Sequence, residues 1–288
     1  MSMTDANIGI EFGTCSWNYD SWTGLVYSGK KSRSAEYLPE YSEKYNTAEI
    51  DSWFYKLPEA ADAEEYRSLT PEGFSFACKI TESISLTHER TRTSSVPLKS
   101  NPEFLSVDAY ADYIKGTEAI RSRIFLAELE FEYLNKQKMS GALEFLKALE
   151  RFVDALEARG LKNALPLGVE CRNANYLTRD YFKALRDFGV AHVFSEKQYL
   201  PHIYELYDKN SDLVGERTAI RLLGGDRKEI EAKTKGVWNT IIEPKKDLPE
   251  IAAMLRDLSE GSRLVKAYLN NHYEGSAPLS IERIKALL

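Results

Sequence analysis

The chain has 288 residues, of which 43% are hydrophobic and 28% are charged, and its formal net charge is −6. This composition is typical of a globular protein, and the net acidity argues against a broad basic surface for duplex DNA. No apolar run is long enough to cross a bilayer, and residues 1–7 lack the basic and apolar regions of a secretory signal, so we expect a cytoplasmic protein without a membrane role.

Eight short runs of β-forming residues are spread along the chain, and segments with helical spacing separate most of them. The runs begin near Ile8, Thr47, Phe74, Ile124, Leu165, Ala191, Thr218 and Leu264. Start and stop signals agree best for a helix over residues 248–260, which Asp247 precedes and Gly261 follows. Gly160 and Gly189 follow two further helical patterns as expected C-caps.

Eightfold alternation of strand and helix predicts an α/β fold, a (β/α)₈ TIM-type barrel, with residues 1–288 forming a single domain. An open doubly wound sheet is the alternative, and it is disfavoured because no GxGxxG motif follows the first strand. Residues 81–102 are rich in Ser, Thr and Arg and predict a long loop after the third strand, of the kind that often forms a lid.

Charged and apolar residues alternate within the predicted strands. In the last strand, Lys266 separates Val265 from Ala267. Because side chains alternate between the faces of a strand, apolar residues are predicted to face the helices and charged residues the barrel interior. Such an interior departs from the usual branched apolar filling. The charged set comprises Glu11, Glu49, Glu128, Glu170, Lys79, Arg172, Arg221 and Lys266.

Several motifs along the chain resemble those of a known family. They are GTCSW at 13–17, EIDSWFYKLP at 49–58, FACK at 76–79, TH at 87–88, VECR at 169–172 and NNHYEGSAP at 270–278. On these residues the chain resembles the YecE-like family, the domain-of-unknown-function family 72. The resemblance implies a TIM-type barrel without an established activity, and a relationship to the endonuclease IV and sugar isomerase barrels is suggested by fold similarity.

The chain departs from the family pattern at two places. The acidic run ELEFEY at 128–133 stands where a Gln-Leu-Pro-Pro-like turn is expected, and NANY at 173–176 stands where His and Trp are common. The acidic rim puts in doubt a site model carried over whole from the family.

The carboxyl ends of barrel strands are where TIM-barrel enzymes place their active sites, so residues there are the site candidates. Glu49, Glu170 and His88 are the candidate catalytic residues, the two glutamates as general acid and base. Arg172 and Arg221 are expected to hold an anion by bidentate contacts. The predicted ligand-binding residues are Trp17, Asp51, Tyr55, Lys79, Arg172, Arg221, Lys266, Asn270, Asn271 and His272.

These residues predict a pocket for an anionic ligand, either a phosphate-containing small molecule or a nucleic-acid end, and an enzyme would then be a hydrolase or isomerase. Two alternatives stay open: a non-catalytic binding module for nucleic acid or a protein partner, and a buried ion-pair lattice that serves only as scaffold. No cofactor is predicted. The four histidines lack HxH or HExxH spacing, so a divalent metal at His88 or His272 is a minor alternative, and His192 and His202 are interpreted as structural or surface residues.

Overall fold

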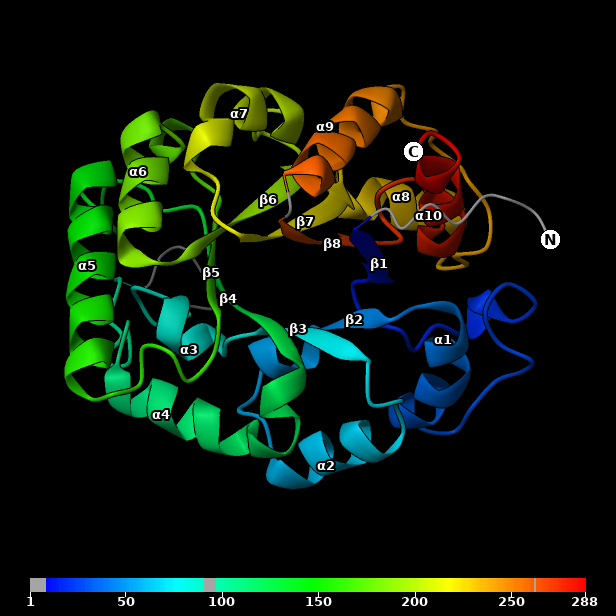
Figure 1. Ribbon diagram of the computed structural model, residues 1–288, viewed down its shortest axis with the longest axis horizontal. Helices are drawn as coiled ribbons and strands as arrows, with labels where there is room; N and C mark the ends of the chain where they lie inside the picture. Colours follow the sequence, from blue (N-terminus) through cyan, green and yellow to red (C-terminus); the bar gives the residue numbers. More distant parts are fainter. Residues whose placement is uncertain (1–8, 91–96, 262) are drawn as a thin grey trace.

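The computed structural model describes residues 9–90, 97–261 and 263–288. Its strands form one parallel sheet in the order β1-β8-β7-β6-β5-β4-β3-β2, and the bridge between Cys15 and Glu49 links the two ends of this order (Figure 1). The strands are β1 Ile10–Thr14, β2 Thr47–Ile50, β3 Ser75–Lys79, β4 Ile124–Phe131, β5 Leu167–Cys171, β6 Ala191–Lys197, β7 Arg217–Gly224 and β8 Leu264–Leu269. The sheet is therefore a nearly closed (β/α)₈ barrel, as the sequence predicts.

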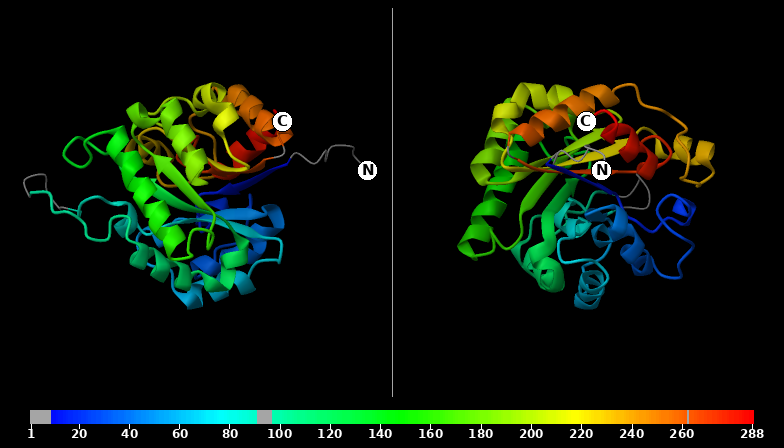
Figure 2. Two further views of the ribbon diagram at one scale, coloured as in Figure 1. Left: turned by 60° about the vertical axis from the view of Figure 1, so that its left-hand side comes forward. Right: turned by 45° about the vertical axis from the view of Figure 1, so that its right-hand side comes forward.

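Helices surround the sheet in all three views (Figures 1 and 2). They are α1 Leu38–Lys44, α2 Ala60–Ser68, α3 Glu82–Ser85, α4 Val107–Gly116, α5 Ala142–Ala158, α6 Arg179–Phe188, α7 Ile203–Asn210, α8 Arg227–Thr234, α9 Leu248–Glu260 and α10 Ala277–Lys285. None of the helices in the described part of the chain is long and apolar enough to cross a membrane.

The local signals in the sequence place most element boundaries correctly. Seven strands begin within two residues of the predicted positions, whereas Ile8, the predicted start of the first strand, lies outside the described residues. Helix α9 has the predicted bounds, and Gly189 follows α6 with a φ of 72°. This left-handed conformation is the one in which glycine ends a helix without steric cost.

The predicted long loop at 81–102 contains one helical turn, α3, and its two flanks are tied together. The side-chain amide of Asn101 donates to the carbonyls of Ser83, at 2.5 Å, and Leu86, at 2.6 Å. Residues 91–96 lie outside the described residues. Figure 2 (left) shows the flanks extending away from the barrel, and a lid function for them stays a prediction.

The two faces of the strands follow the alternation in the sequence. Val265, Ala267 and Leu269 of β8 pack in the large core between sheet and helices. Tyr268, between them, belongs to a separate apolar cluster inside the barrel, where its hydroxyl hydrogen-bonds Thr47 Oγ1 at 2.8 Å. Charged side chains lie inside the barrel on either side of this cluster.

Candidate functional site

Arg221 of β7 lies at the centre of a charged cluster inside the barrel, and only 2% of its surface is exposed. Its Nε and Nη2 donate to the two carboxylate oxygens of Glu49 at 2.6 and 2.7 Å. Its Nη1 donates to Glu170 Oε2 and, at 3.2 Å, to Glu130 Oε2. Glu128 Oε2 lies 3.7 Å from Nε. A single guanidinium is thus bound by acids from three strands.

Lys79 and Arg172 extend this cluster toward the carboxyl ends of the strands. Lys79 Nζ lies 2.7 Å from Asp51 Oδ1 and 2.8 Å from Glu130 Oε2. Arg172 contacts Glu130 Oε1 through Nη2 at 2.6 Å and Glu170 Oε1 through Nε at 3.0 Å. The group, here called the mouth cluster, comprises Glu49, Asp51, Glu128, Glu130, Glu170, Lys79, Arg172 and Arg221.

The mouth cluster is assembled by period-two alternation along several strands. In β4 the core residues Ala127, Leu129 and Phe131 face the helices, so Glu128 and Glu130 face inward. These two acids belong to the run in which the chain departs from the family pattern. With them the cluster has five carboxyl groups and three cations. The carboxyl groups engage all three cations, and Arg172 keeps one-quarter of its side chain exposed.

Two fully enclosed acids of the cluster, Glu49 and Glu128, resist ionisation. Burial raises the pKa of Glu49 to about 7, although Arg221 opposes this shift. Burial and the neighbouring charge of Glu49 raise the pKa of Glu128 well above its ordinary value. Among the described residues, neither carboxyl oxygen of Glu128 has a hydrogen-bond partner. Burial therefore favours the protonated form of Glu128, and it moves the titration of Glu49 to about pH 7.

The acids beside cations behave in the opposite way. Burial opposes ionisation of Asp51, but Lys79 and Arg221 outweigh it and lower the Asp51 pKa to about 2. Glu170 is likewise buried, and Arg221 and Arg172 lower its pKa. Asp51 is the acid of this pair that reaches solvent, because 28% of its side chain is exposed whereas Glu170 is fully enclosed.

Lys197, at the end of β6, borders the mouth cluster. It is not among the site residues predicted from the sequence. Burial and the nearby Arg172 lower its pKa, and Glu170 opposes the shift. Among the described residues it forms no ion pair. It lines a cavity of about 400 Å³ together with Lys245 and Lys246. The alternation Ala191, Val193, Ser195, Lys197 in β6 is the signal that points it inward.

Two cations that were predicted to bind a ligand at the barrel mouth have other surroundings. Lys266 lies at the other end of the barrel, where its Nζ contacts Glu11 at 2.7 Å and the Phe125 ring at 4.9 Å. Arg221 does lie at the mouth, but Glu49, Glu130 and Glu170 take up its donors. Of the four cations predicted as ligand-binding residues, Lys79, Arg172 and Arg221 therefore meet at the mouth and Lys266 does not, and the role of Arg221 in holding an anion stays a prediction.

Three further candidates have different surroundings. Trp17 is buried on the helix side of the sheet, where its Nε1 donates to Ser34 O at 2.9 Å. Tyr55 is 72% exposed, and its ring lies 5.2 Å from that of Phe54, which in turn lies 5.3 Å from Lys79 Nζ. His88 Nδ1 hydrogen-bonds the neighbouring Thr87 at 2.9 Å. Tyr55 is thus the aromatic candidate beside the mouth cluster.

The polar segment after β8 forms a hydrogen-bonded turn. The side-chain oxygen of Asn271 accepts from Trp22 Nε1 at 3.2 Å and from Ala277 N at 2.9 Å. That of Asn270 accepts from His272 N at 3.0 Å, and His272 Nε2 lies 3.1 Å from Glu231 Oε1. Asn271 therefore holds the turn together through its side-chain oxygen, and its role in ligand binding stays a prediction.

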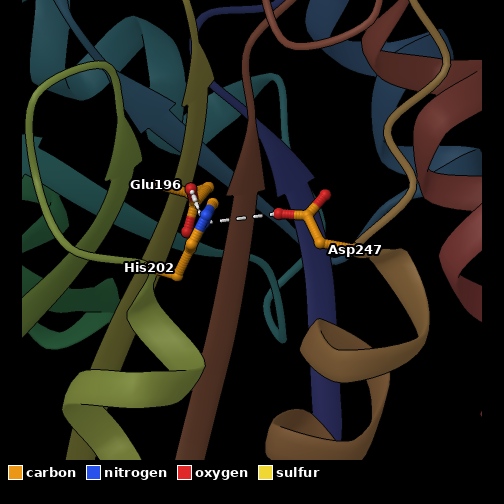
Figure 3. A group of neighbouring side chains, drawn as sticks. All are labelled: Glu196, His202 and Asp247. Carbon is orange, nitrogen blue, oxygen red and sulfur yellow. Dashed lines mark hydrogen bonds and ion pairs between the residues drawn. The ribbon is translucent and has the colours of Figure 1, made fainter.

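Metal-ligating geometry occurs outside the mouth cluster. Within the described residues, one group of three side chains offers ligand atoms within 4.8 Å of one another: Glu196, His202 and Asp247 (Figure 3). His88 and His272, the histidines considered for a metal in the sequence, are not part of it. His202, which is interpreted from the sequence as a structural or surface residue, does belong to this group.

Solved structures with the same fold include two DUF72 family proteins. The one from Enterococcus faecalis has a TM-score of 0.66 at 15% identity, over 97% of this chain and 96% of its own. The one from Thermotoga maritima has a TM-score of 0.64 at 17% identity, over 96% and 98%. A D-tagatose 3-epimerase-like protein is similar with a TM-score of 0.53 at 13% identity, over 96% of each chain. At these identities the similarity shows the fold alone.

Comparison with curated proteins finds no match. The model of one protein family, described as protein of unknown function DUF72, matches residues 11–288. This match covers nearly the whole chain, including every strand of the mouth cluster. The chain therefore belongs to the DUF72 family.

Proposed function

We propose that this protein is an enzyme that carries out acid–base chemistry, either hydrolysis or isomerisation, on a small anionic molecule bound at the barrel mouth. The observation that carries the proposal is the buried carboxyl of Glu49, whose pKa is about 7, beside the partly exposed Asp51. Strongly shifted carboxyl groups at the carboxyl ends of barrel strands are typical of catalytic sites.

Proton transfer is assigned to Glu49 and Asp51 together. A group that titrates near neutral pH can both accept and donate a proton at working pH. Glu49 is fully buried, whereas Asp51, two residues further along the chain, reaches solvent, and both carboxylates lie beside Arg221. Asp51 is thus the group that meets the substrate, with Glu49 as the proton store behind it.

Glu170 has a positioning role in this proposal. It is ionised and enclosed, and it binds both Arg221 and Arg172. Glu170 is fully enclosed and does not reach a substrate, so the catalytic role predicted for it is assigned to Asp51, which reaches solvent and can accept a proton. His88 stays a candidate from the sequence, without a contact to the mouth cluster among the described residues.

The anionic part of the substrate is assigned to Lys197 and Arg172. Lys197 has no carboxylate partner among the described residues, and it is only partly buried, so an anion can approach it. Arg172 is one-quarter exposed. A phosphate or carboxylate group would relieve the repulsion between these two cations.

A ligand screen on the full chain tests binding. Thermal shifts are measured with phosphosugars, nucleotides, sugar acids and short single-stranded oligonucleotides, for the wild type and for Lys197→Met. A ligand at about 100 times its Kd should stabilise the wild type by about 2.7 kcal/mol, and Lys197→Met should lose most of this shift. The control is Lys162→Met, which removes a lysine in the loop before β5, at the opposite end of the barrel.

Turnover of a ligand found in the screen tests the chemistry. Followed by NMR, Asp51→Asn should bind it with little change but react at least about 100-fold more slowly. Binding with equal turnover in the wild type and Asp51→Asn would contradict the acid–base role. Binding without any turnover would favour the non-catalytic binding module, and the absence of any shift across the panel would favour the scaffold.

A further inference from the structure

A second group of titratable side chains lies on the outer side of the barrel, at the loops that follow β6 and precede α9. Glu196 is the penultimate residue of β6, His202 precedes α7 and Asp247 precedes α9. His202 Nδ1 lies 2.9 Å from Glu196 Oε1 and 3.6 Å from Asp247 Oδ2. Figure 3 shows the imidazole between the two carboxylates.

The helix positions of these residues leave their side chains available. Asp247 and His202 occupy N-cap positions, yet neither side chain caps its helix. Asp247 instead points toward His202 (Figure 3). Glu196 is buried, and its second oxygen, Oε2, accepts from Ile203 N at 3.0 Å. This bond orients the carboxylate and leaves Oε1 directed at His202, as outer hydrogen bonds orient metal ligands.

Tyr273 supplies an independent observation at the same place. Its side chain is 1% exposed, and its hydroxyl has no hydrogen-bond partner among the described residues. Tyr273 lines the cavity of about 400 Å³ that Glu196, His202 and Asp247 also line. A buried hydroxyl without a partner costs free energy, so this one calls for a polar group in the cavity.

We propose that Glu196, His202 and Asp247 bind a divalent transition-metal ion, Mn²⁺ or Zn²⁺, and that Tyr273 hydrogen-bonds the exchangeable ligand of that ion. One imidazole nitrogen and two carboxylate oxygens form a donor set that suits these ions, and three protein ligands leave a coordination position open. The two carboxylates balance the charge of the ion.

The open position would face a positively charged cavity. Lys197, Lys245 and Lys246 line the same space. With the ion neutralised by its carboxylates, these lysines favour an anion as the exchangeable ligand. The metal site itself rests only on the three ligands and Tyr273, and it does not depend on the proposed acid–base function of the mouth cluster.

Metal titration of the full chain, stripped with a chelator, tests this inference. Calorimetry with Mn²⁺ and Zn²⁺ should find one site per chain, and Co²⁺ as a spectroscopic probe should develop visible absorption with the same stoichiometry. His202→Gln and Asp247→Asn should each weaken binding at least about tenfold and remove the Co²⁺ spectrum. Neither change removes a helix cap, so circular dichroism should report a folded chain for both.

Two further variants separate the site from adventitious binding. Tyr273→Phe should keep one site but change the Co²⁺ spectrum, because it removes a hydrogen bond to the exchangeable ligand. Asp208→Asn, an exposed position on α7, is the matched control and should bind as the wild type does. The absence of stoichiometric binding in the wild type, or equal binding in His202→Gln and Asp247→Asn, would overturn the proposal. The titration uses no substrate, so its outcome is independent of the ligand screen.

Discussion

The two ends of the barrel interior use the same residue types in different settings. At the mouth, carboxylates from three strands surround the buried Arg221. At the other end, Lys266 pairs with Glu11, whose side chain is 43% exposed, and Arg217 donates to the Phe125 carbonyl at 2.6 Å. Water screens the second pair but is excluded from the first group. Alternating charge in strands therefore raises carboxyl pKa values where several acids share a buried space, whereas at the other end burial lowers the pKa values of Lys266 and Arg217.

The largest expected difference between the two ends is in stability. Arg221→Met leaves several buried carboxylates without their partner and should lower the free energy of unfolding by about 3–5 kcal/mol. Lys266→Met removes a pair with a solvent-exposed acid and should cost about 1 kcal/mol or less. Chemical denaturation at neutral pH measures both.

If Arg221→Met does not yield folded protein, Arg221→Lys replaces it. This variant keeps the charge but loses the bidentate contact with Glu49, so its loss in free energy of unfolding should be intermediate. Equal losses for Arg221→Met and Lys266→Met would contradict the difference in burial.

The pH dependence of stability sharpens the comparison. Burial raises the Glu49 pKa to about 7 in the folded chain, whereas an unfolded glutamate titrates near about 4.3. The folded chain thus holds the proton more tightly, so this contribution is fully present below the unfolded pKa and is lost as pH rises through about 7. The unfolding free energy of the wild type relative to Glu49→Gln should fall by on the order of 2 kcal/mol between roughly pH 5 and pH 8.

Asp212→Asn is the control for this measurement. Its pair with Arg179 is exposed and lowers the Asp212 pKa, so its titration lies below the range tested. Denaturation curves at several pH values give the result for all three proteins. A difference between wild type and Glu49→Gln that stays constant with pH would show that Glu49 does not titrate in this window.

The smallest expected effect on stability is that of replacing a single lysine at the barrel mouth, compared with one at the other end. Lys197 is partly desolvated near Arg172 and has no carboxylate partner among the described residues. Replacing it by Met should raise the free energy of unfolding by less than about 1 kcal/mol, because binding sites often retain groups that reduce stability. Lys266→Met should change stability in the opposite direction. Loss of stability in Lys197→Met would mean that the lysine has a stabilising partner.

The face of each strand residue follows from the sequence. Strand side chains alternate with a period of two, so the apolar Val265 and Ala267 mark the helix side of β8 and place Lys266 inside. The same rule places Glu128 and Glu130 inside the barrel. The bounds of helix α9 were equally predictable from the sequence, because a Pro near its start and a Gly after its end are local signals.

Depth and partners are set by the tertiary structure. Lys266 and Arg221 satisfy the same alternation, yet one lies at each end, because height along a barrel depends on the stagger between tilted strands. The pKa of Glu49 depends in turn on burial by all its neighbours.

The sequence does not show which distant residues meet in space, and the candidate metal site is the clearest case. It comprises Glu196, His202 and Asp247, but Asp247 is distant in the chain and no spacing motif joins the three. The sequence by itself determined the barrel and which side chains enter it, since both follow from local periodicity. Which charges meet, and how far their pKa values shift, was decided by folding, because Coulomb interactions and desolvation depend on distance in space.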